Sequence, residues 1–339
     1  MSRSTSGTPS IRDVARTAGV SVATASRVMA KANYPVAEPT RQKVLEAARS
    51  LGFVANALAR SLARARTDII GVVVPVLINP YYAAMVEAID QAAREHGLTM
   101  LLSLTGGDER RREAVIDDLL ARRVDGLIVC AGAFDHQKLR SREELGMPAV
   151  LIGQQANNGL PIIRTDNRRA GHDAAAYLWG LGHRRFAYLT SLKTWHDFHD
   201  RGRGMMEFLA GTGVPYEAEI MDGLFGEADS YARVRQECDW GLRATALIAS
   251  TDRHALGALA ALADAGRSVP GEVSVMGFDD YVTSGFVRPS LTTMQMLAAE
   301  MGRRAVEMLK RQLLGKSAPQ RPMLQATLVE RGSTGPAAG

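Results

Sequence analysis

The side chains that first suggest a chemistry in this sequence are the basic ones near its N-terminus. Residues 1–66 contain 11 Lys and Arg but only 3 Asp and Glu, which is a net charge of +8. The whole chain of 339 residues carries +5, so the remainder carries −3. Lys and Arg displace counterions from phosphates, and a basic head on a weakly acidic body therefore favours contact with a polyanion such as nucleic acid. The alternative is a basic surface that is only solvated.

The residue pattern in this basic segment predicts elements that could present it to DNA. Apolar residues at helical spacing predict a short helix over residues 12–17, and Gly19 can end it in the left-handed conformation. Ser21 can cap a second helix over residues 22–30, and a third helix opens at residues 38–40. A helix, a tight turn and a capped helix are typical of a helix-turn-helix motif.

Polar and aromatic residues lie beside predicted strands later in the chain. Tyr81 and Tyr82 follow Asn79 and Pro80 where a helix begins after the first strand, and Asp279 directly follows an apolar strand. Aromatic rings can stack on a sugar face or a purine ring, and a carboxylate accepts hydrogen bonds from hydroxyl groups. The two tyrosines could instead pack in the core or at an interface.

The elements that must position these residues alternate from residue 68 onward. Short β-rich runs are predicted at residues 69–75, 98–104, 126–130, 149–152, 162–165, 186–189, 247–250 and 273–278. Amphipathic helical stretches are predicted at residues 82–96, 109–122, 167–181, 255–265 and 298–314. This alternation predicts an α/β fold with parallel sheets, in which so many strands form two lobes with a cleft between them. Ligands in such folds bind at the carboxyl ends of the strands.

These patterns also predict how the chain divides into domains. The predicted parts are a disordered tail at 1–10, a helix-turn-helix at 11–55, a linker at 56–67, a two-lobed α/β domain at 68–332, and a tail at 333–339.

Several segments resemble, in the same order, recurring motifs of one known family. They are IRDVARTAGVSVATASRVMA, TRQKVLEAARSLGFVAN and ALARSLARART, followed by DIIGVVVPVLINPYYAAMVEAI, RRVDGLIV, LGHRRFAYL, STDRHALGAL, VSVMGFDD and PSLTTMQM. Over roughly residues 10–332 the chain thus resembles the lac/gal repressor family of bacterial transcription regulators. The resemblance implies that residues 11–55 form a helix-turn-helix DNA-binding headpiece, that residues 56–67 form a hinge helix, and that residues 68–332 form a periplasmic-binding-protein-like, effector-binding sensor that dimerises. It further implies that lobe 1 of this sensor comprises about 68–166 plus 296–322, and lobe 2 about 167–295 plus 323–332.

Within the headpiece, the resemblance implies that Val22, Ala23 and Arg27 read base edges in the major groove. The Arg27 guanidinium can donate two hydrogen bonds to a guanine edge, which is worth about 1–3 kcal/mol of discrimination. The hydroxyl residues expected to contact phosphate or to cap the helix are Ser21, Thr24 and Ser26. Ser21 could do no more than cap, and the alternative for Arg27 is a surface ion pair with Asp13.

Within the hinge, Leu62 corresponds to a family residue that wedges into the minor groove and kinks the duplex. An apolar wedge unstacks a base step at a cost of about a few kcal/mol, which contacts to the bent DNA offset. Asn56, Ala59 and Arg60 are expected to lie within reach of the groove or the phosphates. The alternative for Leu62 is an ordinary apolar residue in a helix too short to be stable alone.

Within the sensor, the resemblance implies that Asp279 accepts hydrogen bonds from ligand hydroxyls. It also implies that Arg201, just before a helix and three residues ahead of Gly204, binds ligand. Asp252 is a further candidate, although it could only cap the helix that begins near Arg253. The full set of expected effector-binding residues is Tyr81, Tyr82, Trp195, Asp197, Arg201, Asp252 and Asp279.

Residues 195–200 are expected to form a loop that lines this pocket. Trp195 could stack on a ring, and Asp197 could bond hydroxyl groups. The alternatives are a plain surface loop and a metal site at His196 and His199, which would need further converging ligands. No metal and no other cofactor is predicted.

Other classes of protein fit the sequence less well. It has no G-x-x-x-x-G-K loop, no G-x-G-x-x-G after a strand and no G-x-S-x-G elbow, so it is not expected to be an enzyme. The longest uncharged apolar stretch, residues 69–78, is far shorter than the roughly 20 residues of a membrane helix, so no membrane partner is expected. The chain has 2 cysteines, Cys130 and Cys238, and no export signal, which favours the cytoplasm.

The sequence is therefore interpreted as a cytoplasmic regulator of transcription, a repressor that forms a dimer or a higher assembly. Its expected partners are a near-palindromic operator in double-stranded DNA and a small-molecule effector. A sugar or sugar derivative is the expected effector, and a purine or nucleoside is the alternative. A sugar-binding protein of the same sensor fold is the alternative function, although it would have no use for the basic head.

Overall fold

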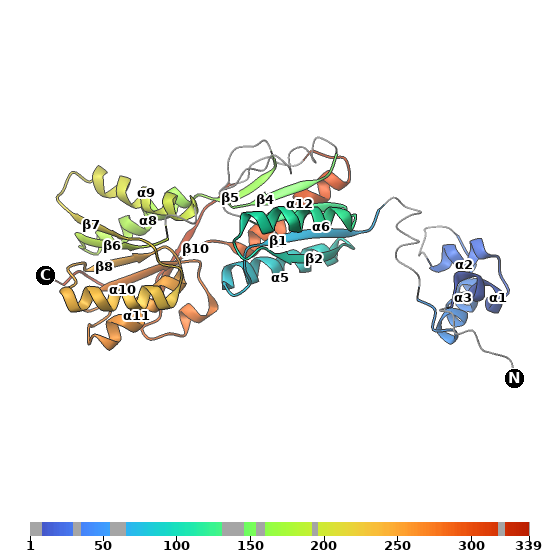
Figure 1. Cartoon of the computed structure of the whole chain (residues 1–339), viewed down its shortest axis with the longest axis horizontal. Coiled ribbons are helices and arrows are strands. Elements are labelled where there is room, and N and C mark those ends of the chain that lie inside the picture. The colour runs from blue at the N-terminus through green and yellow to red at the C-terminus, as the bar shows by residue number, and fades with distance from the viewer. Residues whose placement is uncertain are drawn as a thin grey trace. The chain divides into compact units, whose positions relative to one another are not determined.

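The computed structural model describes residues 9–29, 35–54, 66–130, 146–153, 160–191, 196–317 and 323–338. Contacts within the chain divide it into two compact units, Met1–Asp68 and Ile69–Gly339 (Figure 1). Among the described residues, every helix is too short or too polar to cross a membrane.

The first unit contains three helices around a small apolar core. These are α1 (Ile11–Ala18), α2 (Val22–Met29) and α3 (Glu38–Ser50). Asp13 accepts hydrogen bonds from the backbone and the hydroxyl of Ser10 at the start of α1, and Gly19 ends that helix at a φ of 64°. Val14, Val28 and Val44 are almost completely buried against one another. The expected helix-turn-helix is confirmed, because the left-handed Gly19 ends α1 just before α2 begins.

The second unit contains two six-stranded sheets (Figure 1). The first has the order β11-β5-β4-β3-β1-β2 with all pairs parallel. Its strands are β1 (Ile69–Val74), β2 (Thr99–Leu104), β3 (Gly126–Cys130), β4 (Ala149–Ile152), β5 (Ile162–Thr165) and β11 (Met323–Leu324). Its helices are α5 (Pro80–Glu95), α6 (Glu109–Ala121) and α12 (Ala298–Leu313).

The second sheet has the order β12-β10-β9-β8-β6-β7, and only β12 is antiparallel to its neighbour. Its strands are β6 (Arg185–Leu189), β7 (Glu217–Met221), β8 (Ala246–Ala249), β9 (Ser274–Phe278), β10 (Thr292–Gln295) and β12 (Thr327–Val329). Its helices are α8 (Asn167–Gly180), α9 (His196–Gly211), α10 (Glu227–Trp240), α11 (Asp252–Asp264) and the short 3-10 helix η1 (Val282–Gly285).

Helices cover both faces of each sheet, which explains why the strands read as continuous apolar runs. In β1, Ile70 and Val72 pack with α5 and α12, while Val73 packs with α6 on the other face. In the second sheet, α8 and α9 pack on one face, and α10 and α11 pack on the other. A strand covered on both faces has no polar side to alternate with. The predicted fold class, a small all-α headpiece followed by a two-lobed sensor with parallel sheets, is confirmed.

The ends of the predicted domains differ from the structure near the C-terminus. Residues 323–332 were predicted to lie in lobe 2, but β11 pairs with β5 in the first sheet. A strand of only two residues has no pattern that a sequence can show. Residues 333–339 were predicted to be a tail, but Ser333 and Thr334 are buried, and the Ser333 hydroxyl donates to the Val275 carbonyl at 2.6 Å. Residues 1–8, of the predicted N-terminal tail, and residues 55–65, most of the predicted hinge, lie outside the described residues.

Candidate functional site

Helix α2 presents the residues that were expected to read DNA. Val22, Ala23, Ser26 and Arg27 are exposed, whereas Ala25 of the same helix is buried in the core of the headpiece. Residues spaced by three or four positions lie on one face of a helix, so the exposed residues share a face that the core does not use.

The hydroxyl and acidic residues beside this face have local partners. Ser21 caps α2, since its hydroxyl oxygen accepts a hydrogen bond from the Thr24 N–H at 3.1 Å and lies 2.9 Å from the Thr24 hydroxyl. Asp13 forms its ion pair with Arg16 at 2.6 Å. Hydrogen bonds from Ser10 lower the pKa of Asp13. The hinge residues Asn56, Arg60 and Leu62 lie outside the described residues.

A cavity of about 470 Å³ lies between the two lobes of the second unit. Its walls come from loops that follow the carboxyl ends of strands in both sheets, as expected for parallel sheets. Val76 follows β1 and Gly106 follows β2, while Ser191, Thr251 and Asp279 follow β6, β8 and β9. A volume of this size suits a small metabolite.

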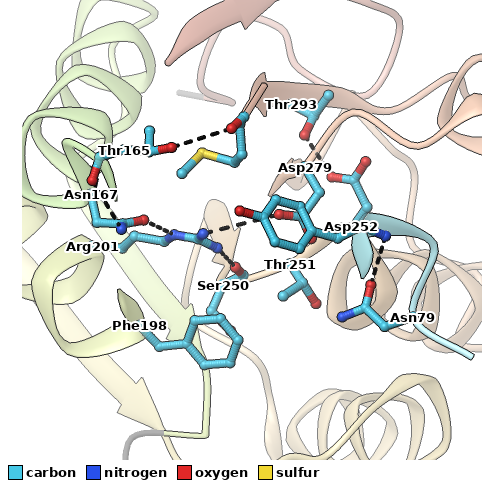
Figure 2. A network of polar contacts seen from close by, with 12 residues as sticks. Asn79, Thr165, Asn167, Phe198, Arg201, Ser250, Thr251, Asp252, Asp279 and Thr293 are labelled. Atoms are coloured by element: carbon cyan, nitrogen blue, oxygen red, sulfur yellow. Dashed lines mark hydrogen bonds and ion pairs between the residues drawn. The ribbon is translucent and has the colours of Figure 1, made fainter. Parts of the chain in front are cut away.

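Arg201 of α9 lines this cavity and is only 4% exposed. Its Nε donates to the Asn167 side-chain oxygen at 2.8 Å, and its Nη1 donates to the Ser250 carbonyl (Figure 2). Its Nη2 lies 4.0 Å from Asp279 Oδ1. The guanidinium also lies over the rings of Phe198 and Phe278, at 5.3 and 4.8 Å. The cation is therefore held in place from several sides before any ligand arrives.

Close packing between helices sets the position of Arg201 in α9. A Cβ atom on Gly171 of α8 would lie 1.9 Å from the Arg201 carbonyl oxygen. A Cβ atom on Gly204 of α9 would lie 1.8 Å from the Arg168 carbonyl oxygen. Glycine at both positions lets the two backbones approach, and this brings Asn167 at the start of α8 within reach of Arg201.

Asp279 faces Arg201 from the end of β9. Its side chain is 4% exposed, and Tyr281 donates from its hydroxyl to Asp279 Oδ2 at 2.7 Å. Burial raises the pKa of Asp279 to about 7, although the nearby Arg201 opposes this shift. Asp279 and Arg201 thus form a buried polar pair that a ligand with hydroxyl groups could bridge.

The two predicted tyrosines lie on the opposite side of the cavity, at the start of α5. The rings of Tyr81 and Tyr82 meet edge to face at 5.4 Å, and both line the cavity. The Tyr81 hydroxyl donates to the Met301 sulfur at 3.3 Å, and burial raises the pKa of both phenols. Both rings also pack against the core of the first lobe, so core packing and cavity lining are not exclusive.

The structure corrects the prediction for residues 195–200. Trp195 lies outside the described residues, and residues 196–200 form the first turn of α9 and not a loop. Arg201, which was expected just before a helix, lies inside α9 for the same reason. The sequence HDFHD has no strong helix pattern of its own, and α9 begins there because later residues such as Met205 pack against α8. Asp197 does line the cavity.

Among the described residues, no further metal-ligating group joins His196 and His199 at the metal site considered from the sequence. The rings lie 6.2 Å apart, and the part of the chain that the structure describes contains no group of three or more potential ligands around them. A separate cavity of about 410 Å³ beside them is lined, among described residues, by the single helix α9.

The structure also gives Asp252 a different place from the one expected. Its carboxylate is completely buried and accepts hydrogen bonds from the Ser284 and Thr293 hydroxyls, both at 2.6 Å, and from the Tyr281 N–H at 3.0 Å. Burial raises its pKa to about 6, against the effect of these hydrogen bonds. Asp252 holds η1 and β10 against α11, and it is not among the described residues that line the cavity.

His254, two residues further along α11, lines the cavity and was not singled out from the sequence. Its Nε2 lies 3.2 Å from the Leu224 carbonyl, and its Nδ1 lies within 3.0 Å of the Ser250 and Thr251 hydroxyls. Burial lowers its pKa to about 4, so it is neutral, with Nε2 as donor and Nδ1 as acceptor. The sequence feature that could have identified His254 is the run of polar residues that directly follows the predicted strand at 247–250.

Together, an exposed helix-turn-helix and a two-lobed unit with a polar, aromatic-lined cleft define a ligand-responsive DNA-binding regulator. Residues 10–56 match bacterial regulatory proteins of the lacI family, and residues 175–334 match a periplasmic binding protein-like domain. The chain is 34% identical to the transcriptional regulator GalR of Salmonella typhimurium over 88% of this chain and 87% of GalR. It is 32% identical to the ribose operon repressor of Escherichia coli, over 95% and 99% of the two chains.

The solved structures agree with these sequence relatives. The lac repressor dimer bound to operator and the anti-inducer ONPF superposes with a TM-score of 0.87 at 27% identity, covering 97% of this chain and 100% of the other. The chain belongs to the LacI family of bacterial regulatory proteins. It is a DNA-binding regulator of transcription, and the relatives named here are regulators and not enzymes.

Proposed function

We propose that this regulator is a homodimeric repressor whose affinity for a near-palindromic operator is set by a small metabolite in the cleft. The observation that carries this proposal is the convergence of Arg201 and Asp279 from one lobe, and of Tyr81 and Tyr82 from the other, on one cavity. A ligand that touches both lobes binds one arrangement of them better than another, and this differential affinity shifts the population of lobe arrangements.

The favoured ligand is a sugar or a sugar derivative. The buried Arg201–Asp279 pair offers a donor and an acceptor to hydroxyl groups, and the tyrosine rings offer faces for stacking. The regulator CelR, solved with cellobiose, shares the fold at 28% identity and a TM-score of 0.71, which supports this class. A purine or nucleoside is the second candidate, because the repressor PurR of Mannheimia succiniciproducens is 31% identical to this chain.

DNA recognition is assigned to the exposed face of α2 and to the hinge. Arg27 donates to a guanine edge, Val22 and Ala23 contact neighbouring bases, and Leu62 wedges into the minor groove. Basic residues of the headpiece bind phosphates, so the complex weakens as salt rises. Two headpieces in a dimer match two operator half-sites, since the symmetry of the protein is mirrored in the DNA.

The direct test is an electrophoretic mobility shift with genomic fragments and a random competitor. We expect preferential binding of a fragment with a near-palindromic site, and a 5–150-fold change in affinity, from a coupling of about 1–3 kcal/mol, when the effector is added. The panel contains ribose, cellobiose, other mono- and disaccharides, purines and nucleosides. Equal affinity for all fragments, with and without every metabolite, would contradict the proposal.

A further inference from the structure

We propose that Arg331 and Gln295 are positioning residues of the effector site, because together they hold Asp280 and so fix the turn that aims Asp279 at the cleft. Neither residue is among the described residues that line the cavity. We call the contacts of Arg331 and Gln295 with the Asp280 carboxylate the Asp280 clamp. The importance of this clamp for effector binding rests on the proposed function. The positioning itself is a property of the protein without ligand.

The turn after β9 has a backbone that needs outside support. Asp279 has a φ of 117° and Asp280 a φ of 60°, so two consecutive residues with side chains lie in the left-handed region. Such conformations are unfavourable for residues other than glycine, and they persist only where surrounding contacts hold them. The Asp279 N–H donates to the Met294 carbonyl at 2.9 Å, and the Tyr281 N–H donates to Asp252 Oδ2 at 3.0 Å, so backbone hydrogen bonds hold the residues on either side of Asp280.

The Asp280 carboxylate supplies support between these two backbone bonds, because each of its oxygens has a partner. Arg331 Nη2 donates to Oδ1 at 2.6 Å, and Gln295 Nε2 donates to Oδ2 at 2.9 Å. The Arg331 side chain is itself fixed, since its Nη1 donates to the Leu291 carbonyl at 2.8 Å. The side chains of Arg331 and Asp280 are only 22% and 13% exposed, so water competes little for this charge-assisted pair.

The clamp also links the cleft to the segments that join the lobes. Along the described strands the chain passes between the two sheets three times, after β5, β10 and β11. Gln295 is the last residue of β10, directly before one passage, and Arg331 lies two residues after β12, the strand that follows another passage. A ligand that moves Asp279 therefore acts on a turn that is bonded to the residue before one passage and to a residue beyond the strand after another. This gives Asp280 a route by which occupancy of the cleft reaches the lobe connections.

The titration of Asp279 reports whether the turn is in place. The groups that act on its carboxyl are Arg201, Asp252, Tyr281 and Asp197, and burial is the largest influence. If the turn relaxes, Asp279 moves toward water and its pKa falls from about 7 toward the ordinary value of about 3.9. Removal of the Arg331 cation would by itself raise this pKa, because it leaves Asp280 as an unpaired anion nearby. A fall therefore reports displacement of the carboxyl and not the loss of a charge.

The experiment follows the carboxyl carbon of Asp279 by NMR in the full-length protein with ¹³C-labelled aspartate, and the Asp279→Asn spectrum serves only to assign the resonance. In Arg331→Met we expect the pKa of Asp279 to fall by more than about one unit. Arg331→Lys keeps a cation for Asp280 and should restore most of the shift. Arg243→Met removes a pair with Glu217 in the same lobe, where Arg243 is 74% exposed, and should leave Asp279 unchanged. An unchanged or higher pKa in Arg331→Met overturns the proposal.

A second variant keeps the test decisive if Arg331→Met does not fold. Gln295→Leu removes one neutral hydrogen bond from Asp280 and should move the pKa of Asp279 in the same direction by a smaller amount. No change in this variant, in protein that melts like wild type, also counts against the clamp. Because no effector or operator takes part, failure of the clamp and failure of the proposed regulatory function have separate outcomes.

Discussion

At the scale of single residues, the cleft combines groups that are polar and yet almost completely buried. Arg201 satisfies its guanidinium with Asn167 and the Ser250 carbonyl, so it does not depend on a ligand for its position. Such preorganisation reduces the entropy that ligand binding must overcome. The same burial makes substitution costly, since partners that remain would lose their hydrogen bonds.

Replacement of Arg201 tests its assignment to the effector site. Arg201→Ala should abolish the response of the DNA complex to the effector found in the metabolite panel, while DNA binding without effector stays within about twofold of wild type. A loss of about 1–3 kcal/mol of stability in the sensor is also expected, because Asn167 and Ser250 lose a donor. Effector titrations by mobility shift measure the first effect and thermal denaturation the second. An unaltered effector titration would reject the assignment.

The pH dependence of stability should report the buried Asp252. Its pKa is raised to about 6 in the folded protein, above the value of about 3.9 in an unfolded chain. A raised pKa contributes stability below the unfolded pKa, and this contribution is lost as pH rises through about 6. Asparagine stays neutral at every pH. The free energy of unfolding of Asp252→Asn relative to that of wild type should therefore rise by roughly 2–3 kcal/mol as pH increases from about 4 to about 7. Thermal or urea denaturation at both pH values checks this, and a difference that does not grow with pH would count against it.

At the scale of elements, the close approach of α8 and α9 is what places Arg201 beside Asn167. Gly204→Ala puts a methyl group 1.8 Å from the Arg168 carbonyl, so the helices must separate. We expect a loss of about 3 kcal/mol and a weaker effector response. Gly211→Ala, at the end of the same helix, meets nothing within 4 Å and should be neutral or stabilise by about 0.5–1 kcal/mol. Equal melting temperatures for the two variants would show that this packing is unimportant.

At the scale of the whole molecule, the proposed function requires the sensor to act on the headpiece through the predicted hinge. Leu62→Ala should weaken binding to the specific operator about tenfold or more while ligand binding stays intact, because the proposed wedge would act only on DNA. The comparison is a mobility shift with operator and with random DNA, beside a calorimetric titration of the effector. A variant that binds operator as well as the parent would show that the hinge assignment is wrong.

The sequence by itself determined the features that depend on neighbouring residues. Gly19 and Ser21 define the turn of the helix-turn-helix, and continuous apolar runs such as 69–74 define strands covered on both faces, because caps and burial patterns are local. Asp279 was found because it directly follows a predicted strand, and Tyr81 and Tyr82 were found because they follow Asn79 and Pro80 where a helix begins. The structure brings all three residues to one cavity.

Only the tertiary structure decided the features that depend on distant partners. Asp252 and Asp279 both follow strands and look alike in sequence, yet one carboxylate is occupied by Ser284 and Thr293 and the other faces the cleft. The start of α9, the strand β11 and the buried Ser333 likewise follow from packing against segments remote in the chain. Hydrogen bonds and packing between remote segments are set by the fold as a whole, and no local pattern of residue types records them.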